Sequence, residues 1–363
     1  MAAKPRVCVG MSGGVDSSVA AYLLKQQDCD VIGITFRNWP QDCISRASDK
    51  CCGPQAVTDA RMVAHALDIP HYVIDEIDSF QEKVIDYFVA EYRSGRTPNP
   101  CVICNEQIKF GTLWKKAQAL GADRIATGHY ARITAESPAD GPATRYQLRQ
   151  GRDRQKDQSY FLFNLCQEQL ARTLLPLGDL DKQQTRAIAR EMGLKTHDKV
   201  ESQEICFVPD KDYGRFLRDA AGLPDRPGEI VTLDGRVLGF HQGIQYFTIG
   251  QREGLNLGGQ KEPLYVAALD AGTNRVIVGP REELMRDEFE IDRCRWLAGD
   301  NPAAPLTGDV KPRYQHPGCR ATVEPLPNGR ARVRLAKPER AIAPGQAAVL
   351  YQDDLVVGGG WIC

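Results

Sequence analysis

The chain has 363 residues, a formal net charge of −1, and 42% hydrophobic and 26% charged residues. These values are typical of a globular protein with two or three domains, and they give no overall charge signal for nucleic-acid binding. The N-terminus leads directly into an apolar segment without room for a signal peptide, and no apolar stretch approaches membrane-spanning length. We therefore expect a cytoplasmic protein, in which the 12 cysteines stay reduced unless they act in catalysis or bind metal.

A glycine-rich segment, residues 9–18, follows a short apolar run and precedes a helical pattern. Glycines in such a strand-to-helix turn let backbone N–H groups surround an anion, and the helix N-terminus adds positive potential. No Gly-Lys-Ser/Thr follows, so this is not the kinase-type phosphate loop. The segment predicts a triphosphate site rather than an empty glycine turn, with Asp16 placed to bind a phosphate-bound Mg²⁺. The hydroxyls available to phosphate oxygens belong to Ser12, Ser17 and Ser18.

Apolar runs alternate with helical patterns through the first part of the chain, which predicts an α/β fold with a doubly wound parallel sheet over residues 1–209. The predicted strands are residues 6–9, 31–36, 71–75 and 124–128, and the predicted helices lie around 56–67, 79–93 and 110–120. Ligands of such sheets bind at the carboxyl ends of the strands. Loops 10–16, 36–52 and 128–132 are expected to meet there.

The pattern changes after residue 209. Residues 210–279 contain one helical segment, 211–221, and then short apolar runs between glycine, proline and Asp-Gly turns, which predict a small, mostly β module. Residues 280–363 predict a small antiparallel β-barrel. Basic residues outnumber acidic ones eight to two over 311–340 and five to one over 145–156. Such clusters attract phosphates locally, although a solvated basic face is the alternative.

Two cysteines stand in contexts that suggest chemistry. Cys104 follows two prolines, which favour an extended segment, and a helix is expected to begin just after it; a helix N-terminus lowers a thiol pKa. Cys206 lies between Ile205 and Phe207, where it is equally compatible with a buried structural thiol. We expect both cysteines on loops at the same edge of the sheet.

Several spaced motifs together resemble the tRNA 2-thiouridylases, a family of the PP-loop ATP pyrophosphatase superfamily. The similarity covers essentially the whole chain. Its motifs are the loop Ser12–Ser17, Asn99-Pro100-x-x-x-Cys104-Asn105, Ala126–Arg132, Lys156–Leu162, Glu204–Phe207, Thr248–Arg252 and Gly258–Gly259.

The resemblance implies a division of labour among these motifs. ATP would activate the C2 oxygen of the wobble uridine as an adenylate, and Cys206 would carry sulfur as a persulfide. Cys104 would be the nucleophile, either on the activated base or on the persulfide, releasing sulfide. A Cys104–Cys206 disulfide would follow and require reduction. The residues expected to line the nucleotide pocket are Gly10, Met11, Ser12, Gly13, Gly14, Val15, Asp16, Ser17, Phe36 and Gly128. The residues expected to contact tRNA are Asn99, Pro100, Cys101, His129, Lys156, Asp157, Gln158, Arg313, Tyr314 and Gln346.

The resemblance also implies partners: the tRNAs for Glu, Gln and Lys, and a cysteine desulfurase or relay protein as the sulfur donor. A structural histidine is the less favoured alternative for His129. Two other functions stay open from the residues alone. One is a different PP-loop adenylating synthetase, which would leave both thiols idle, and the other is an RNA-binding or redox-sensing protein with a degenerate nucleotide site.

Cys101 is a departure, because many family members have Asp at this position. Cys101, Cys104 and Cys206 together match the three-cysteine set of a [4Fe–4S] cluster with one open iron, which we state as an alternative sulfur-transfer route. Zinc is disfavoured because Cys101-x-x-Cys104 lacks a second nearby pair, unless Cys51 and Cys52 complete it.

Overall fold

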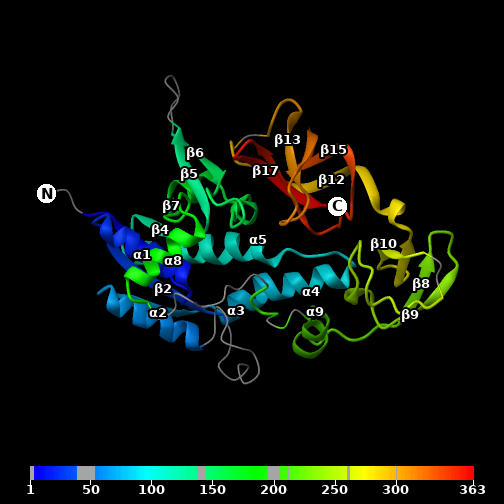
Figure 1. Ribbon diagram of the computed structural model, residues 1–363, viewed down its shortest axis with the longest axis horizontal. Coiled ribbons are helices and arrows are strands. Elements are labelled where there is room, and N and C mark those ends of the chain that lie inside the picture. Colours follow the sequence, from blue (N-terminus) through cyan, green and yellow to red (C-terminus); the bar gives the residue numbers. More distant parts are fainter. Residues whose placement is uncertain are drawn as a thin grey trace.

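The structure is a computed structural model, and it describes residues 4–38, 54–136, 144–194, 205–208, 210, 212–259, 262–299 and 301–363. Figure 1 shows three parts along the long axis: a layered N-terminal part, a barrel formed by the C-terminal strands, and a smaller sheet at the far end. The predicted Cys51–Cys52 contribution to a metal site, most of the predicted loop 36–52, and Glu204 of the predicted motif Glu204–Phe207 lie outside the described residues.

Five parallel strands form the first sheet, in the order β3-β2-β1-β4-β7. Their bounds are β1 (Arg6–Gly10), β2 (Asp30–Arg37), β3 (His71–Asp75), β4 (Arg124–Ala126) and β7 (Thr173–Leu174). β1 is central, and its residues Val7, Cys8 and Val9 are fully buried, as continuous apolar runs in parallel sheets are. The predicted doubly wound α/β fold is confirmed.

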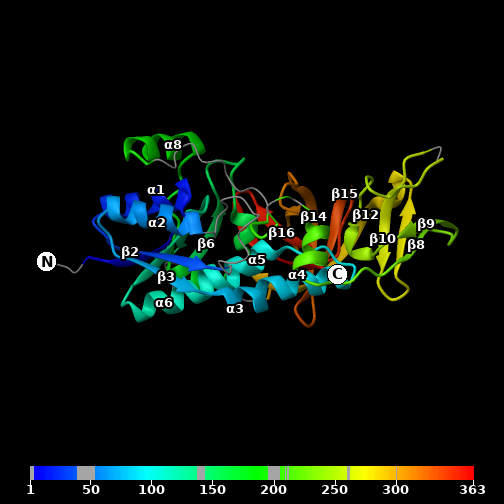
Figure 2. The ribbon, with the colours of Figure 1, turned by 90° about the horizontal axis from the view of Figure 1, so that it is seen from below.

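Helices cover both faces of this sheet (Figure 2). The helices on one face are α1 (Val15–Gln26), α2 (Pro54–Ala66) and α8 (Lys182–Glu191). The predicted helix at 79–93 is one run of α3 (Ile77–Phe80), a π-helical turn η2 (Gln81–Ile85) and α4 (Asp86–Arg93). A second run joins α5 (Pro100–Cys104), a π-helical segment η3 (Asn105–Thr112) and α6 (Leu113–Ala119).

The start of α5 corrects one prediction. The two prolines do not keep the chain extended up to Cys104, because Pro100 is the first residue of the helix. Proline is tolerated there, since the first turn of a helix does not use its N–H groups. Cys101 therefore lies in the first turn and Cys104 further along the same helix, so that Cys104 is helical rather than on a loop.

The central module has the predicted helix, formed by α9 (Tyr213–Arg215) and the π-helical turn η5 (Phe216–Ala220), followed by a four-stranded mixed sheet. The strands are β8 (Gly228–Thr232), β9 (Val237–His241), β10 (Tyr265–Asp270) and β11 (Arg275–Gly279). β8 and β11 are parallel, whereas the other pairs are antiparallel.

Six antiparallel strands form the C-terminal barrel, which closes through the pairing of β12 with β17. The predicted barrel is thereby confirmed. Its strands are β12 (Met285–Trp296), β13 (Leu306–Lys311), β14 (Cys319–Leu326), β15 (Arg330–Arg340), β16 (Ala347–Gln352) and β17 (Leu355–Ile362).

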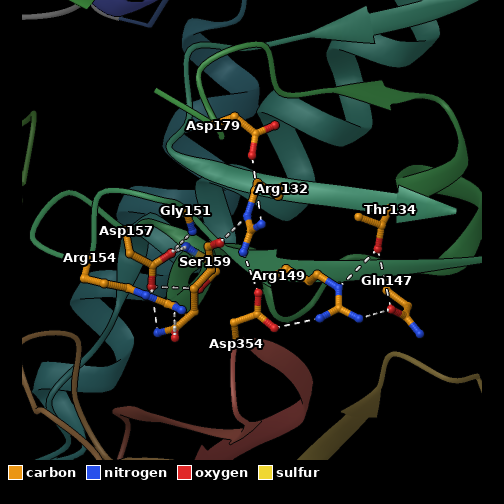
Figure 3. A network of polar contacts seen from close by, with 11 residues as sticks. Arg132, Thr134, Gln147, Arg149, Gly151, Arg154, Asp157, Ser159, Asp179 and Asp354 are labelled. Carbon is orange, nitrogen blue, oxygen red and sulfur yellow. Dashed lines mark hydrogen bonds and ion pairs between the residues drawn. The ribbon is translucent and has the colours of Figure 1, made fainter. Parts of the chain in front are cut away.

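A hairpin from the N-terminal part joins this barrel. It consists of β5 (Ala131–Glu136) and β6 (Arg145–Gln150), and β6 pairs with β17 at Leu355. Just before Leu355, Asp354 binds two arginines of the hairpin, Arg132 and Arg149 (Figure 3). The Arg149 Nη1 to Asp354 Oδ1 distance is 2.6 Å. This ion-pair network fastens the barrel to the hairpin.

The network gives a pH-dependent stability prediction. Burial alone would raise the pKa of Asp354, but Arg149 and Arg132 outweigh it and lower the pKa below its usual value. Its contribution is therefore present above the unfolded-state pKa of about 3.9 and lost as the pH falls through the folded-state value. We expect Asp354→Asn to destabilise the protein by about 1–3 kcal/mol at pH 7 in urea unfolding, and the difference from the wild type to shrink below about pH 4. The exposed Asp287→Asn is the control, and an equal loss at both pH values would contradict the prediction.

Candidate active site

The glycine-rich loop connects β1 to α1, at the carboxyl edge of the sheet, as predicted. Gly14 is the residue before the helix, and the Ser17 and Ser18 hydroxyls donate to its carbonyl at 3.2 Å and 2.8 Å. The Ser17 hydroxyl also accepts from the Ser12 N–H at 3.1 Å. These serines thus hold the loop in shape. The N-terminus of α1, where an anion is expected to bind, follows directly.

Two glycines are required by close approach of other backbone atoms. Gly13 has φ +69°, and a Cβ there would lie 2.2 Å from the Ala56 carbonyl oxygen. A Cβ on Gly128, just after β4, would lie 2.7 Å from the Ser17 N. The loops after β1 and β4 therefore touch at the start of α1, and Gly128 lies against the backbone of the glycine-rich loop.

Asp16 lies in the first turn of α1 and is bound by two side chains from other elements. The Tyr130 hydroxyl donates to Asp16 Oδ1 at 2.9 Å, and Lys182 Nζ donates to the same oxygen at 2.7 Å. Tyr130 also lies 3.0 Å from the Thr185 hydroxyl on α8. Neither Tyr130 nor Lys182 was singled out as a site residue from the sequence.

The two distant thiols lie on one aromatic cluster. Cys104 on α5 and Cys206 in a turn both pack against this cluster, which includes Phe88 and Phe207. Phe36, at the end of β2, packs against the same cluster. Its role in the nucleotide pocket stays a prediction.

Cys101 completes a group of three thiols. Burial, with a smaller contribution from Cys206, raises the pKa of Cys101 to about 11, and Lys109 partly opposes this. Cys101 is therefore a neutral thiol at pH 7, although it lies in the first turn of a helix. The structure records all three cysteines as reduced.

The iron–sulfur alternative on these three thiols stays a prediction. Among the residues that the structure describes, no group of three or more His, Cys, Asp or Glu side chains is arranged to hold a metal ion. Cys51 and Cys52, which were considered for a zinc site, lie outside the described residues.

His129, the residue after Gly128, is buried. Its Nδ1 lies 2.7 Å from the Thr127 hydroxyl, and its ring lies 5.7 Å from that of Phe110. Burial and the nearby Lys109 hold the pKa of His129 well below its usual value, so the ring is neutral at pH 7. A neutral imidazole can hydrogen-bond or stack against a base but adds no positive charge.

The segment carrying Asn99 and Pro100 is fixed by the barrel. Gln346 Nε2 donates to the Thr97 and Pro98 carbonyls at 3.2 Å and 3.1 Å. Tyr160, whose hydroxyl donates to the Ala347 carbonyl at 2.8 Å, also reaches the Asn99 side chain. Gln346 was predicted to contact tRNA, and here it holds the backbone just before the predicted target-base residues.

Asp157 is buried within a tight turn (Figure 3). Its carboxylate accepts from the Gly151 and Ser159 N–H groups at 3.0 Å and 3.1 Å and from the Ser159 hydroxyl at 2.9 Å. The side chain therefore shapes the turn, and its neighbours Lys156 and Gln158 are only partly buried. Gln158 Oε1 accepts from the Tyr130 N–H at 3.0 Å, so this turn is hydrogen-bonded to the residue whose hydroxyl binds Asp16.

Arg313 and Tyr314 of the barrel lie beside the segment that carries Tyr160 and Phe161. The Tyr314 ring lies 4.3 Å from the Phe161 ring and 5.8 Å from the Tyr160 ring. Both residues are partly buried beside the turn that ends in Tyr160. The predicted tRNA-contact residues of the barrel and of the first domain are thus adjacent.

Three family models match consecutive parts of the chain. They are described as a tRNA methyl transferase HUP domain (residues 5–210), a tRNA methyl transferase PRC-barrel domain (215–280) and an aminomethyltransferase beta-barrel domain (286–362). None of the described helices has the length and apolar character needed to cross a membrane.

Curated relatives match the chain from end to end. A protein of Clostridium perfringens named tRNA-specific 2-thiouridylase MnmA is 48% identical over 99% of this chain and 98% of its own length. The Moorella thermoacetica protein of the same name is 51% identical over 98% of each chain. A solved 4-thiouridine synthetase–RNA complex with bound ATP covers 57% of this chain and 46% of its own at 18% identity, with a TM-score of 0.36, which is too low to support a conclusion. On the full-length relatives, this chain belongs to the tRNA-specific 2-thiouridylase family.

Proposed function

We propose that the protein transfers sulfur to C2 of the wobble uridine of tRNA in an ATP-dependent reaction. The observation that carries the proposal is the placement of Cys104 and Cys206 on one aromatic cluster, joined by Phe36 to the strand edge that bears the glycine-rich loop. We also propose that residues 1–209 carry catalysis, that 210–279 form a central module and that 280–363 bind tRNA.

Activation uses the loop Gly10–Ser17, with Phe36 and Gly128 beside it. The C2 oxygen of the uridine attacks the α-phosphorus of ATP, the bond to the β-phosphate breaks, and pyrophosphate leaves. Backbone N–H groups at the start of α1 offset the charge on the phosphates. Asp16 supplies the single carboxylate that is sufficient for a phosphate-bound Mg²⁺. The uridine oxygen becomes part of an AMP leaving group.

Sulfur transfer uses the two thiols. Cys206 carries the persulfide, and the Cys104 thiolate attacks Cys206 Sγ, so that the bond from Sγ to the outer sulfur breaks. A Cys104–Cys206 disulfide forms and hydrosulfide leaves, which then attacks C2 and displaces AMP. The thiol chemistry is balanced only if a reductant restores both thiols before the next turnover. The sulfur donor is a cysteine desulfurase or a relay protein.

The substrate lies across the first domain and the barrel. Asn99, Pro100 and Cys101 would face a base that is flipped out of its loop. Lys156, Gln158, Arg313 and Tyr314 would contact the surrounding RNA, with Asp157 shaping the turn and Gln346 fixing the Asn99 segment. The substrates are the tRNAs for Glu, Gln and Lys, and the reaction takes place in the cytoplasm.

The persulfide route predicts that Cys101 is dispensable. We expect Cys101→Ser to keep thiolation within about tenfold of the wild type, since only Cys104 and Cys206 exchange sulfur. An iron–sulfur route would instead lose activity completely, because it would lose a cluster ligand. Thiolation is measured by mass spectrometry of tRNA nucleosides, with iron and sulfide analysis of anaerobically purified protein beside it.

The proposed function is tested by incubating the protein with tRNA, ATP, Mg²⁺ and sulfide. We expect 2-thiouridine in the digested tRNA, together with one pyrophosphate released for each modified base. Pyrophosphate release without any thionucleoside would favour a different adenylating synthetase. Binding of tRNA with neither product would favour the non-enzymatic alternative.

A further inference from the structure

Lys182 is an unusual residue in its setting. It is the first residue of α8, and only 9% of it is exposed. Lysine is seldom buried to this degree, and a cation at a helix N-terminus opposes the helix dipole. Helix stability therefore does not explain its presence, since Asp181 already caps α8 through the Gln184 N–H at 2.8 Å.

Its ammonium group reaches the nucleotide loop. Lys182 Nζ lies 2.7 Å from Asp16 Oδ1 and 5.5 Å from the centre of the Tyr130 ring. Asp16 is the second residue of α1, directly behind the glycines of the loop. The lysine therefore places its positive charge beside Asp16, next to the loop at which the phosphates of ATP are expected to bind.

The backbone of Lys182 is fixed while its long side chain can rotate. Its N–H donates to Asp153 Oδ2 at 3.1 Å, and Asp153 Oδ1 accepts from the Gln155 and Lys156 N–H groups at 3.1 Å and 3.3 Å. The basic turn that was predicted to contact tRNA thus holds the start of α8. A lysine with an anchored backbone and a four-carbon stem can change its anionic partner without movement of the helix.

We propose that Lys182 is a phosphate-binding residue of the ATP site. Before ATP binds, its charge neutralises Asp16, which would otherwise repel the triphosphate. When ATP binds, Lys182 pairs with the β- and γ-phosphates and stabilises the pyrophosphate as it leaves, and Asp16 becomes available to a divalent cation. The inference rests on the proposed nucleotide position at residues 10–17.

The test compares ATP with AMP, which lacks the β- and γ-phosphates. For Lys182→Met we expect ATP affinity to fall about tenfold or more, AMP affinity to stay within twofold, and tRNA-dependent pyrophosphate release at saturating ATP to fall about 100-fold. Lys182→Arg should recover part of both losses. Lys115→Met, which removes an exposed lysine on α6, is the matched control and should behave as the wild type.

Three results would overturn the proposal. Equal losses of ATP and AMP affinity would mean that Lys182 only supports the loop. Unchanged ATP affinity together with pyrophosphate release near the wild-type rate would mean that it does not touch the phosphates. Normal ATP binding by a Gly13→Ala variant would place the nucleotide elsewhere, and the proposed site would then fail together with this inference.

Discussion

With sulfur supplied by a cysteine desulfurase or relay protein instead of free sulfide, replacing either Cys104 or Cys206 with serine is expected to abolish 2-thiouridine formation, by at least about 10³-fold, while pyrophosphate release continues. A hydroxyl cannot carry a persulfide or form a disulfide, so no sulfur can reach the activated base. Activation of the uridine uses the glycine-rich loop, which shares no thiol with the sulfur-transfer step. The measurements are mass spectrometry of tRNA nucleosides and a pyrophosphate assay on the same reaction.

Cys294→Ser is the matched control, because this partly buried cysteine lies on β12 of the barrel rather than at the thiol cluster. It should leave both measurements unchanged. The two catalytic variants also differ in a predicted way: after treatment with a sulfur donor, Cys104→Ser should retain a persulfide on Cys206, whereas Cys206→Ser should not. Thiolation by both variants at the wild-type rate would contradict the two-thiol scheme.

The sequence was informative wherever a local pattern was sufficient. The apolar run before the glycines predicted β1, and the helical pattern after them predicted α1, which begins at Val15. Parallel strands bring their carboxyl ends to one edge, so the approach of Gly128 to the loop followed from the fold class. These features depend on residues within about one element of each other.

Contacts between distant segments were missed. Arg145–Gln150 gave only a basic cluster in the sequence, yet these residues form β6 and join the barrel through Leu355. Lys182 lies in an ordinary helical pattern, and only the fold brings it to Asp16, 166 positions away. The signal available in the sequence was weak: a lysine directly after the capping Asp181, where a negative charge is preferred.

The helix at Pro100 shows a different reason for error. The prolines were correctly read as incompatible with a helix interior, but the first position of a helix tolerates proline. In the resulting helix, Cys101 lies in the first turn and Cys104 three residues further along. Burial then decides the chemistry of Cys101, since it raises the pKa of that thiol despite the helix N-terminus.

Gly13→Ala is the second variant expected to have a large effect, through a different cause. The new Cβ would lie 2.2 Å from the Ala56 carbonyl oxygen, at a φ of +69° that residues other than glycine rarely adopt. The clash involves backbone on both sides, so a side-chain rotation cannot relieve it and the loop must change shape. We expect pyrophosphate release to fall by about 100-fold or more, since the N–H groups that hold the phosphates would no longer point at one site.

Gly193→Ala separates the clash from the backbone strain, because Gly193 has φ +67° with no atom within 4 Å of the added Cβ. That control should cost about 1 kcal/mol of stability in urea unfolding and leave pyrophosphate release near the wild-type rate. If Gly193→Ala impairs release as much as Gly13→Ala does, general destabilisation rather than the shape of the loop explains the loss.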